Sequence, residues 1–224
     1  MSFKDNGYIL IKNFLSKDMT SFLYEYIKLK QQVTDYYFNI DSPDYNEHKD
    51  GYYNDELVAD TFSCYSDLAF ESLMLHIKPK LEEISNLKLT PTYSYFRFYK
   101  TNDELKIHRD KIACEISTTI CLGIEGDKKW PIYFSKNVDK SDSIKIITEP
   151  GDLVLYRGCD FWHWRDKFEG IKNAQAFLHF NDVNNQYAEF AEYDCRPHLG
   201  LPSEYKDDYK LSKCIELNDK LKNG

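Results

Sequence analysis

The sequence predicts an α+β fold that is mainly β: a double-stranded β-helix (a cupin-like jelly roll) with N-terminal helices packed on one sheet. About eight short strand patterns, separated by turn residues, lie between Thr92 and Phe180, and antiparallel strands in that number are typical of a double-sheet jelly roll. Two amphipathic helical segments precede them, with the period expected of helices that cover a sheet. Because no repeat or linker interrupts the pattern, we expect one domain over residues 1–224, with its jelly-roll core at about 92–180.

Composition and charge narrow the classes of protein. Aromatic residues make up 16% of the chain, which suits a fold rich in sheet. The net charge of −8 argues against nucleic acid as a general partner, since an acidic surface repels phosphates. No segment approaches 18 continuous apolar residues, and the first residues lack the apolar run of a signal peptide, so we expect neither a membrane span nor a leader. Six scattered cysteines without a C-x-x-C pair predict reduced thiols and a cytoplasmic protein.

The N-terminal third supplies one strand and two helices. Residues 8–14 read as a strand, and Ser16 is a good N-cap for the helix that follows. That helix has apolar residues at helical spacing, which should pack on the main sheet: Met19, Phe22, Leu23, Tyr26 and Ile27. Residues 66–85 predict a second helix, in which Pro79 should cause a kink or a break.

The segment 31–60 between these helices has no sustained period, although it is rich in tyrosine. A loop of this length is usually functional or disordered, and the tyrosines argue against simple disorder. Two interpretations remain: an ordered flap over the mouth of a site, or an ordinary surface excursion. His48, within it, is expected to be solvated.

The core strands follow in order. Residues 92–100 alternate cleanly, so that Tyr93, Tyr95, Arg97 and Tyr99 share one face of the strand. Further strands are expected at residues 115–123, 130–134, 144–148, 153–156 and 175–180, and a short helix at 213–222. The tight turn Pro150-Gly151-Asp152 separates two of these strands.

The triplet His108-Arg109-Asp110 is the strongest chemical signal in the chain. On a strand, residues two apart point to the same face, so the imidazole and the carboxylate reach one point. They offer two ligands of a 2-His-1-carboxylate site, which holds Fe(II) and leaves positions open for co-substrate and oxygen. The third ligand must come from a later strand, where His163 and His179 are the candidates.

With these motifs in place, the chain resembles the Fe(II)/2-oxoglutarate-dependent oxygenases, and in layout their prolyl-hydroxylase-like branch. The matching pieces are GYILIKNFLS, YSYFRFY, HRD, EISTTICLG, PGDLVLY, His163 and QAFLHF, in family order from Gly7 to about Phe180. Their order and spacing are more specific than any single piece. The resemblance implies that His163 is the distal metal ligand, because it follows PGD and a strand.

The resemblance also implies that 2-oxoglutarate binds the metal and that its far carboxylate meets a cation. An Arg fork or a Lys suits that contact. Lys172 lies nine positions after the distal histidine, where the branch has a basic residue. Arg97 is the rival, on the same strand face as Tyr99, and Arg165 is a third candidate. The alternative for Arg97 is a structural ion pair with Glu115.

The activity implied is that of an oxidoreductase: a dioxygenase that uses Fe(II), 2-oxoglutarate and O2 to hydroxylate a C–H bond, releasing succinate and CO2. A peptidyl proline is the first candidate substrate, and a free amino acid or small metabolite the second. A non-catalytic jelly-roll binding module and a nucleic-acid demethylase are further alternatives, the last disfavoured by the acidic charge.

Overall fold

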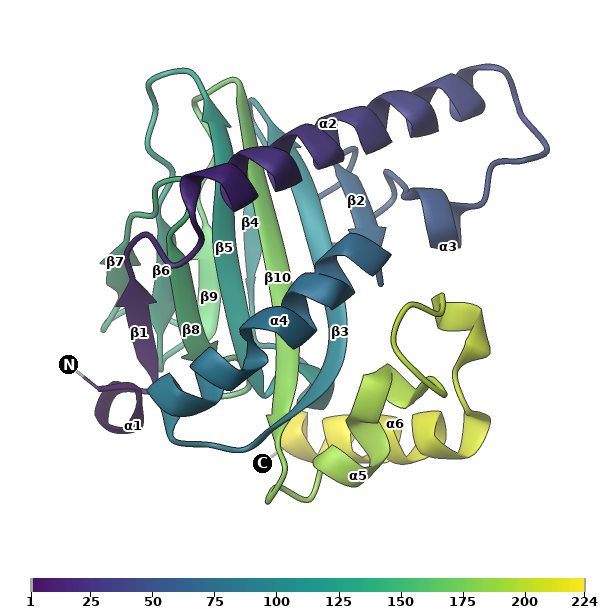
Figure 1. The fold of residues 1–224 in the computed structure, drawn as a ribbon. Helices are drawn as coiled ribbons and strands as arrows, with labels where there is room; N and C mark the ends of the chain where they lie inside the picture. The colour runs from purple at the N-terminus through teal and green to yellow at the C-terminus, as the bar shows by residue number, and fades with distance from the viewer. Residues whose placement is uncertain (1, 224) are drawn as a thin grey trace.

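The computed structural model describes residues 2–223 and is built on two antiparallel sheets (Figure 1). The strands are β1 (Tyr8–Ile11), β2 (Phe62–Tyr65), β3 (Leu89–Lys100), β4 (Leu105–His108), β5 (Ile116–Glu125), β6 (Ile132–Ser135), β7 (Ile144–Ile146), β8 (Leu153–Arg157), β9 (Trp162–Arg165) and β10 (Lys172–Asp182). One sheet has the order β1-β8-β5-β10-β3-β2 and the other β4-β9-β6-β7. The eight strands expected between residues 92 and 180 are confirmed as β3 to β10.

Helices cover one face and one end of this arrangement. They are α1 (Phe3–Asn6), α2 (Lys17–Asn39), α3 (Glu47–Asp50), α4 (Leu68–Ser85), α5 (Ala188–Ala191) and α6 (Asp208–Asn223), with 3-10 turns η1 (Ile112–Cys114), η2 (Glu192–Cys195) and η3 (Ser203–Tyr205). Both α2 and α4 cross the outer face of the six-stranded sheet, as expected, whereas α5 and α6 lie near the end of β10 (Figure 1). Among residues 2–223, no helix is long and apolar enough to cross a bilayer.

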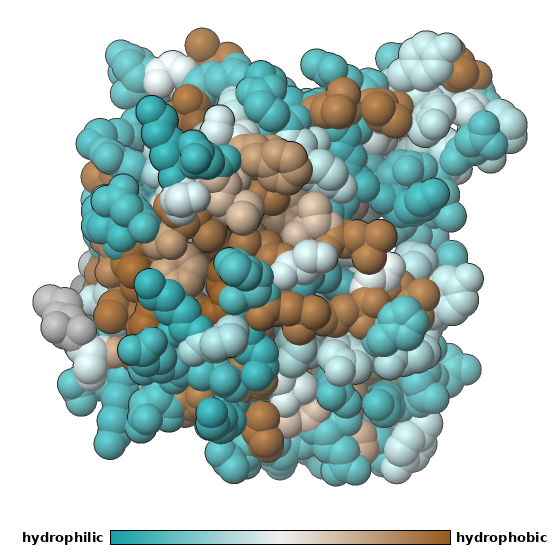
Figure 2. Space-filling model, viewed as in Figure 1, coloured by the Kyte–Doolittle hydropathy of each residue, from teal (hydrophilic) through white to brown (hydrophobic). Residues whose placement is uncertain are grey.

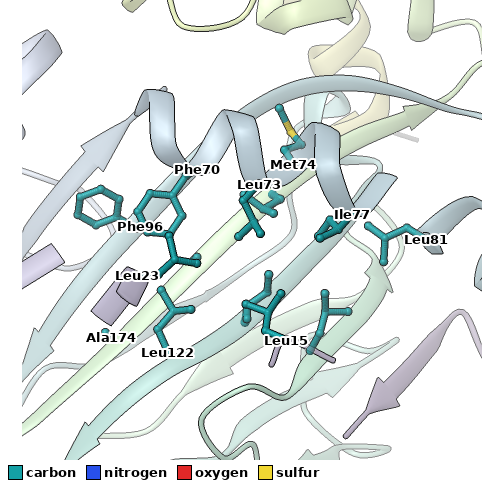
Figure 3. Packing of buried hydrophobic residues seen from close by; sticks show 14 of the residues in the cluster. Leu15, Leu23, Phe70, Leu73, Met74, Ile77, Leu81, Phe96, Leu122 and Ala174 are labelled. Carbon is teal, nitrogen blue, oxygen red and sulfur yellow. The ribbon is translucent and has the colours of Figure 1, made fainter. Parts of the chain in front are cut away.

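The main hydrophobic core lies between α2, α4 and the six-stranded sheet. Leu23 from α2 and Phe70 from α4 are buried against Phe96 and Leu122 of the sheet (Figure 3). Figure 2 shows apolar residues gathered between the two helices and surrounded by polar ones. Burial of a side chain such as Phe70 stabilises the fold by roughly 1.5–3 kcal/mol, so this layer fixes the sheet on which the site is built.

Helix α2 begins as expected and ends later. The hydroxyl of Ser16 accepts a hydrogen bond from the N–H of Met19 at 3.2 Å, which confirms the N-cap. The helix runs on to Asn39 and takes up the first nine residues of the segment expected to be a flap. The buried hydroxyl of Thr34 donates to the carbonyl of Asp50 at 2.7 Å, and this tertiary bond offsets the weak apolar period there.

One sequence expectation about the helices is wrong, and of the kink or break expected at Pro79 the break is absent. Phe22 is 65% exposed and Met19 38% exposed, because the face of α2 that packs against the core contains Leu23 and Ile27, with Tyr24 and Tyr26 partly buried beside them. Pro79 does not break α4, which continues from Leu68 to Ser85. Leu75, the residue whose carbonyl loses its helical donor to the proline, is half-exposed, so water can reach that carbonyl.

The two faces of β3 separate core from site. Phe96 and Phe98 pack in the core beneath the helices, whereas Tyr95 and Tyr99 belong to a second cluster on the inner face, between the sheets. This confirms the alternation expected from the sequence. The central strand β10 pairs with β3 on one side and β5 on the other, and so aligns inward-facing residues of three strands.

Candidate active site

His108, Asp110 and His163 lie together at one end of the space between the sheets. His108 is paired directly with His163 across β4 and β9, and their ring centroids are 4.2 Å apart. One potential ligand atom from each of the three residues lies within 4.8 Å of the other two. Asp110 stands just beyond the end of β4, not on it as expected, and its N–H donates to the carbonyl of Gly158 at 3.0 Å.

Gly158 allows this close approach of two chain segments. A Cβ at this position would collide with the carboxylate of Asp110 and the carbonyl of Cys114. Because glycine has no Cβ, the turn after β8 can approach the segment after β4 closely enough to form this backbone hydrogen bond. The glycine in YRGCDF therefore places the carboxylate beside the two histidines.

The three side chains present acceptors to one another and no donor. The Nδ1 of His108 lies 2.7 Å from the carbonyl of Lys106, and that of His163 lies 3.1 Å from the carbonyl of Phe161. A carbonyl only accepts, so each Nδ1 carries the proton and each neutral ring presents the lone pair of Nε2. Those Nε2 atoms lie 3.8 and 3.6 Å from Oδ1 of Asp110. Lone pairs that converge in this way, from two imidazole nitrogens and one carboxylate oxygen, are suited to bind a metal cation.

Both imidazoles are held neutral. Burial, followed by the charge of its neighbour His163, lowers the pKa of His108 to about 4. Burial, together with the charges of Arg165 and Arg97, lowers the pKa of His163 to about 4 as well. A neutral imidazole is the form that binds a metal, so both rings are ready as ligands at neutral pH.

Ser117 and His179 support the carboxylate from behind. The hydroxyl of Ser117 donates to Oδ2 of Asp110 at 2.9 Å, which leaves Oδ1 facing the two imidazoles. Nδ1 of His179 lies 2.8 Å from the same hydroxyl oxygen. A second cluster of possible metal ligands contains His179 together with Asp110 and Cys114. It is therefore close to the site and outside the trio of His108, Asp110 and His163; which histidine binds metal stays a prediction.

A cavity of about 780 Å³ opens from this trio. Its lining includes the buried residues Ile132 and Tyr156 and, from the C-terminal segment, Lys206 and Lys222. Further walls come from β3, β10 and the segment before β2: Tyr52, Asn54, Asp55, Glu56, Leu57, Tyr93, Tyr95, Arg97, Phe177. The second half of the expected flap, including His48, thus borders the cavity.

Arg97 lies in the cavity wall and has an acidic partner. Its exposure is 7%, and its NH2 donates to Oδ2 of Asp55 at 2.9 Å. The proposed alternative partner, Glu115, instead accepts hydrogen bonds from Asn181 and Asn185. The ion pair expected for Arg97 therefore exists, but with a different carboxylate.

Arg165 is fully buried between the sheets and has no carboxylate within ion-pair distance among residues 2–223. Its NH1 donates to the carbonyl of Trp130 at 2.8 Å, and its NH2 lies 3.3 Å from Oε1 of Gln175 and 3.5 Å from the hydroxyl of Thr119. Its Nε has no partner, and burial lowers its pKa. A buried guanidinium without a counter-ion is costly, which points to an anion that binds there.

Tyr99 and Lys172 lie apart from the metal trio. The hydroxyl of Tyr99 is 3.5 Å from NH1 of Arg97, and its ring packs edge-on against Trp130 at 4.7 Å. The ammonium of Lys172 lies 4.8 Å over the ring of Phe98, a residue of the core beneath the helices. Lys172 is thus on the other face of β10 from the cavity.

Sequence reasoning missed Asp55, Ser117, Thr119 and Gln175. The strand EISTTICLG did contain a usable signal, because Ser117 and Thr119 alternate onto one face. Asp55 gave no such signal, since it lies in an irregular loop. The three tryptophans of the chain, Trp130, Trp162 and Trp164, are not among the residues that line the cavity.

No protein-family model matches the sequence. No curated protein matches it either. Solved structures do match, at the level of fold. A prolyl-4-hydroxylase from Pseudomonas putida is 15% identical with a TM-score of 0.58, over 81% of this chain and 96% of that one.

Two further matches have bound ligands. HygX from Streptomyces hygroscopicus, with nickel, 2-oxoglutarate and hygromycin B, is 10% identical with a TM-score of 0.58, over 81% of this chain and 85% of that one. A Trichoplax adhaerens prolyl hydroxylase, in complex with a peptide of hypoxia inducible factor, is 12% identical with a TM-score of 0.58, over 80% and 85%. The resemblance to prolyl hydroxylases and other Fe(II)/2-oxoglutarate oxygenases is thus confirmed at the level of the fold.

Proposed function

We propose that this protein is an Fe(II)- and 2-oxoglutarate-dependent dioxygenase that hydroxylates a C–H bond of a peptide or small molecule. The observation that carries the proposal is the convergence of two imidazole Nε2 atoms and one carboxylate oxygen without a donor among them. The shared fold supports it, and we infer that the two sheets form a jelly roll, in one oxygenase domain over residues 1–224.

The donor set fits the proposed metal. His108, Asp110 and His163 would hold Fe(II), since two nitrogen ligands and one carboxylate suit a ferrous ion that keeps positions open. The bound ion supplies the activation of oxygen and the oxidation of the C–H bond. Ser117 orients the carboxylate through Oδ2, and the backbone carbonyls that bond each Nδ1 fix the orientation of the rings.

Arg165 is our choice for the far carboxylate of 2-oxoglutarate. On β9 it lies two residues beyond His163, and on β5 Thr119 lies two residues beyond Ser117. Two residues of a strand span about 6.6 Å, a length comparable to an extended five-carbon diacid. The guanidinium of Arg165 and the hydroxyl of Thr119 lie together there, whereas Lys172 lies over the ring of Phe98. The proposal therefore favours Arg165 over Lys172 and Arg97.

The binding of Fe(II) tests the proposal most directly. We expect one Fe(II) per chain in anaerobic equilibrium dialysis, and loss of that binding in Asp110→Ala and in His163→Ala. The matched control is His76→Ala, because His76 is exposed on α4, far from the cavity lining. His179→Ala should keep the metal, since the trio remains complete.

Unchanged metal stoichiometry in both Asp110→Ala and His163→Ala would contradict the proposal. Loss of iron in His179→Ala but not in His163→Ala, with both proteins folded, would show that the wrong histidine was chosen. Turnover of 2-oxoglutarate to succinate by the iron-loaded protein separates an oxygenase from a non-catalytic binding module.

A further inference from the structure

Arg97 has spare hydrogen-bonding capacity in the cavity wall. Its guanidinium lies 4.8 Å from the ring centroid of Tyr95 and 5.6 Å from that of Phe177. Nε has no partner, and NH1 has only the long 3.5 Å contact to the hydroxyl of Tyr99. Asp55 bonds NH2 at a single point. A guanidinium offers five N–H donors in a fork that matches a carboxylate, so most of its donors remain for a ligand.

Asp55 brings a carboxylate to Arg97 from a separate segment of chain. Its Oδ2 accepts hydrogen bonds from NH2 of Arg97 at 2.9 Å and from the hydroxyl of Tyr95 at 2.6 Å. Its Oδ1 accepts from the N–H groups of Leu57 and Val58, at 2.8 and 3.1 Å, within its own loop. The cavity wall thus contains a carboxylate-binding arrangement, composed of Arg97 and Tyr95, that a loop residue occupies.

The charge of the cavity differs from that of the whole protein. Five basic side chains line it, against four acidic ones, in a chain whose net charge is −8. The basic residues are Arg97, Arg109, Lys111, Lys206 and Lys222. One of the four acids is Asp110, the proposed metal ligand. Because Lys111 and Lys206 also pair with Asp194, the cavity is close to neutral, and it therefore repels an anion less than the acidic surface of the whole protein does.

We propose that Arg97 binds a carboxylate of the substrate, and that Asp55 holds that place when no substrate is bound. The inference rests on the proposed function, because it takes this cavity to be the substrate site. Arg165 provides a separate cation for 2-oxoglutarate, so the two carboxylates have different arginines. The hydroxyl of Tyr95, 2.6 Å from Oδ2 of Asp55, is the second donor to the substrate carboxylate.

A carboxylate and its matched amide test the inference without turnover. The probes are 4-fluorobenzoate and 4-fluorobenzamide, whose binding to the metal-free protein is followed by fluorine NMR. We expect benzoate to bind more tightly than the amide. Asp55→Asn should tighten benzoate binding by about tenfold, since it removes the competing charge and keeps an oxygen for the loop N–H groups. Arg97→Gln should weaken it by roughly 10- to 150-fold and leave the amide unchanged.

Glu47→Gln is the matched control. Glu47 lines the same cavity, and its replacement by Gln removes one negative charge, as Asp55→Asn does. Glu47 forms no ion pair with Arg97, so 4-fluorobenzoate binding should change far less than in Asp55→Asn. If Arg97→Gln fails to fold, as judged by thermal unfolding, Arg97→Lys keeps the charge without the fork and should give an intermediate loss. Excess 2-oxoglutarate should leave benzoate binding intact.

Equal binding of the two probes, or equal benzoate affinity in Asp55→Asn and Glu47→Gln, would overturn the inference. Displacement of benzoate by 2-oxoglutarate would overturn it too, since both would then share one arginine. The failure of the proposed function is a separate result: it appears as absent Fe(II) binding, which this metal-free assay does not require.

Discussion

Arg97 and Arg165 lie between the same two sheets, yet their surroundings differ. Arg97 is on β3 at the cavity wall, and a loop carboxylate, Asp55, pairs with it. Arg165 is on β9 and fully buried, and its recorded partners are a carbonyl, an amide and a hydroxyl. Both leave Nε without a partner.

This difference separates two kinds of cation site. Hydrogen bonds to neutral partners offset part of the desolvation cost of a buried guanidinium, and a bound anion would offset the rest. A guanidinium that already has a carboxylate is stable without ligand, and its ligand must compete. Arg165 therefore fits a co-substrate that is always required, whereas Arg97 fits a substrate that exchanges with Asp55.

The largest effect should be seen in 2-oxoglutarate affinity. We expect Arg165→Gln to weaken 2-oxoglutarate binding by about 10- to 150-fold, since a charge-assisted hydrogen bond contributes roughly 1.5–3 kcal/mol. Arg97→Gln should leave that affinity nearly unchanged. Isothermal titration of the metal-loaded proteins measures both. The reverse result would assign 2-oxoglutarate to Arg97 and remove the basis of the comparison.

The pKa values of His108 and His163 should reflect the same difference between the two arginines. Burial and then Arg165 and Arg97 lower the pKa of His163, whereas burial and then His163 are the main causes that lower the pKa of His108, with a smaller effect of Arg97. In the metal-free protein, Arg165→Gln should raise the pKa of His163 more than that of His108, and Arg97→Gln should raise both. Imidazole NMR titrations measure each value. A larger pKa shift of His108 than of His163 in Arg165→Gln would contradict this difference between the two arginines.

The same pKa values predict an acid-sensitive metal-free protein. Native values near 4 lie below the ordinary value of about 6.5. Protonation therefore favours the unfolded chain, so the stability is fully present above about pH 6.5 and is lost as the pH falls towards 4. The midpoint of thermal unfolding, measured from about pH 7 to about pH 4, should fall through this window. Bound metal should oppose the fall, because it binds the deprotonated forms of its ligands and so competes with protons.

A smaller effect should come from Tyr95, which donates to Asp55 but not to the surroundings of Arg165. Tyr95→Phe removes one hydrogen bond, worth about 1 kcal/mol. We expect exchange of the Leu57 and Val58 amides, which donate to Asp55, to become about fivefold faster. Tyr99→Phe is the control, since its hydroxyl does not contact Asp55. Equal exchange in the two variants would mean that Tyr95 does not hold the loop.

The sequence was most informative where a periodic pattern meets a strand. The alternation of residues 92–100 predicted which side chains of β3 face the core and which face the cavity, because period two is a property of the backbone. The N-cap at Ser16 was predicted on local chemistry alone. The end of α2 was not, because a tertiary bond from Thr34 to the carbonyl of Asp50 extends it into a segment without an apolar period.

The same contrast between local sequence patterns and tertiary contacts applies to the site. His108 and Asp110 are only two positions apart in the chain, so their spacing identified them as a pair, and His163 followed from its place after a turn and a strand. Asp55 could not be found this way, since its role depends on a loop that meets β3 more than 40 residues later. The position of Lys172 depended on register: one residue along β10 decides between the core and the cavity.

The order of the strands has a consequence for how the chain is made. β10 lies in the middle of the six-stranded sheet, between β5 and β3, although it is the last strand to be synthesised. Until Asp182, the last residue of β10, has left the ribosome, the sheet can form only as two separate parts with open edges. One part is β3 with β2, and the other is β1 with β8 and β5. Pairings that span most of the chain, such as Tyr8 with Tyr156, add long loop closures that slow folding. We therefore expect nascent or truncated chains without β10 to need protection from edge-to-edge association.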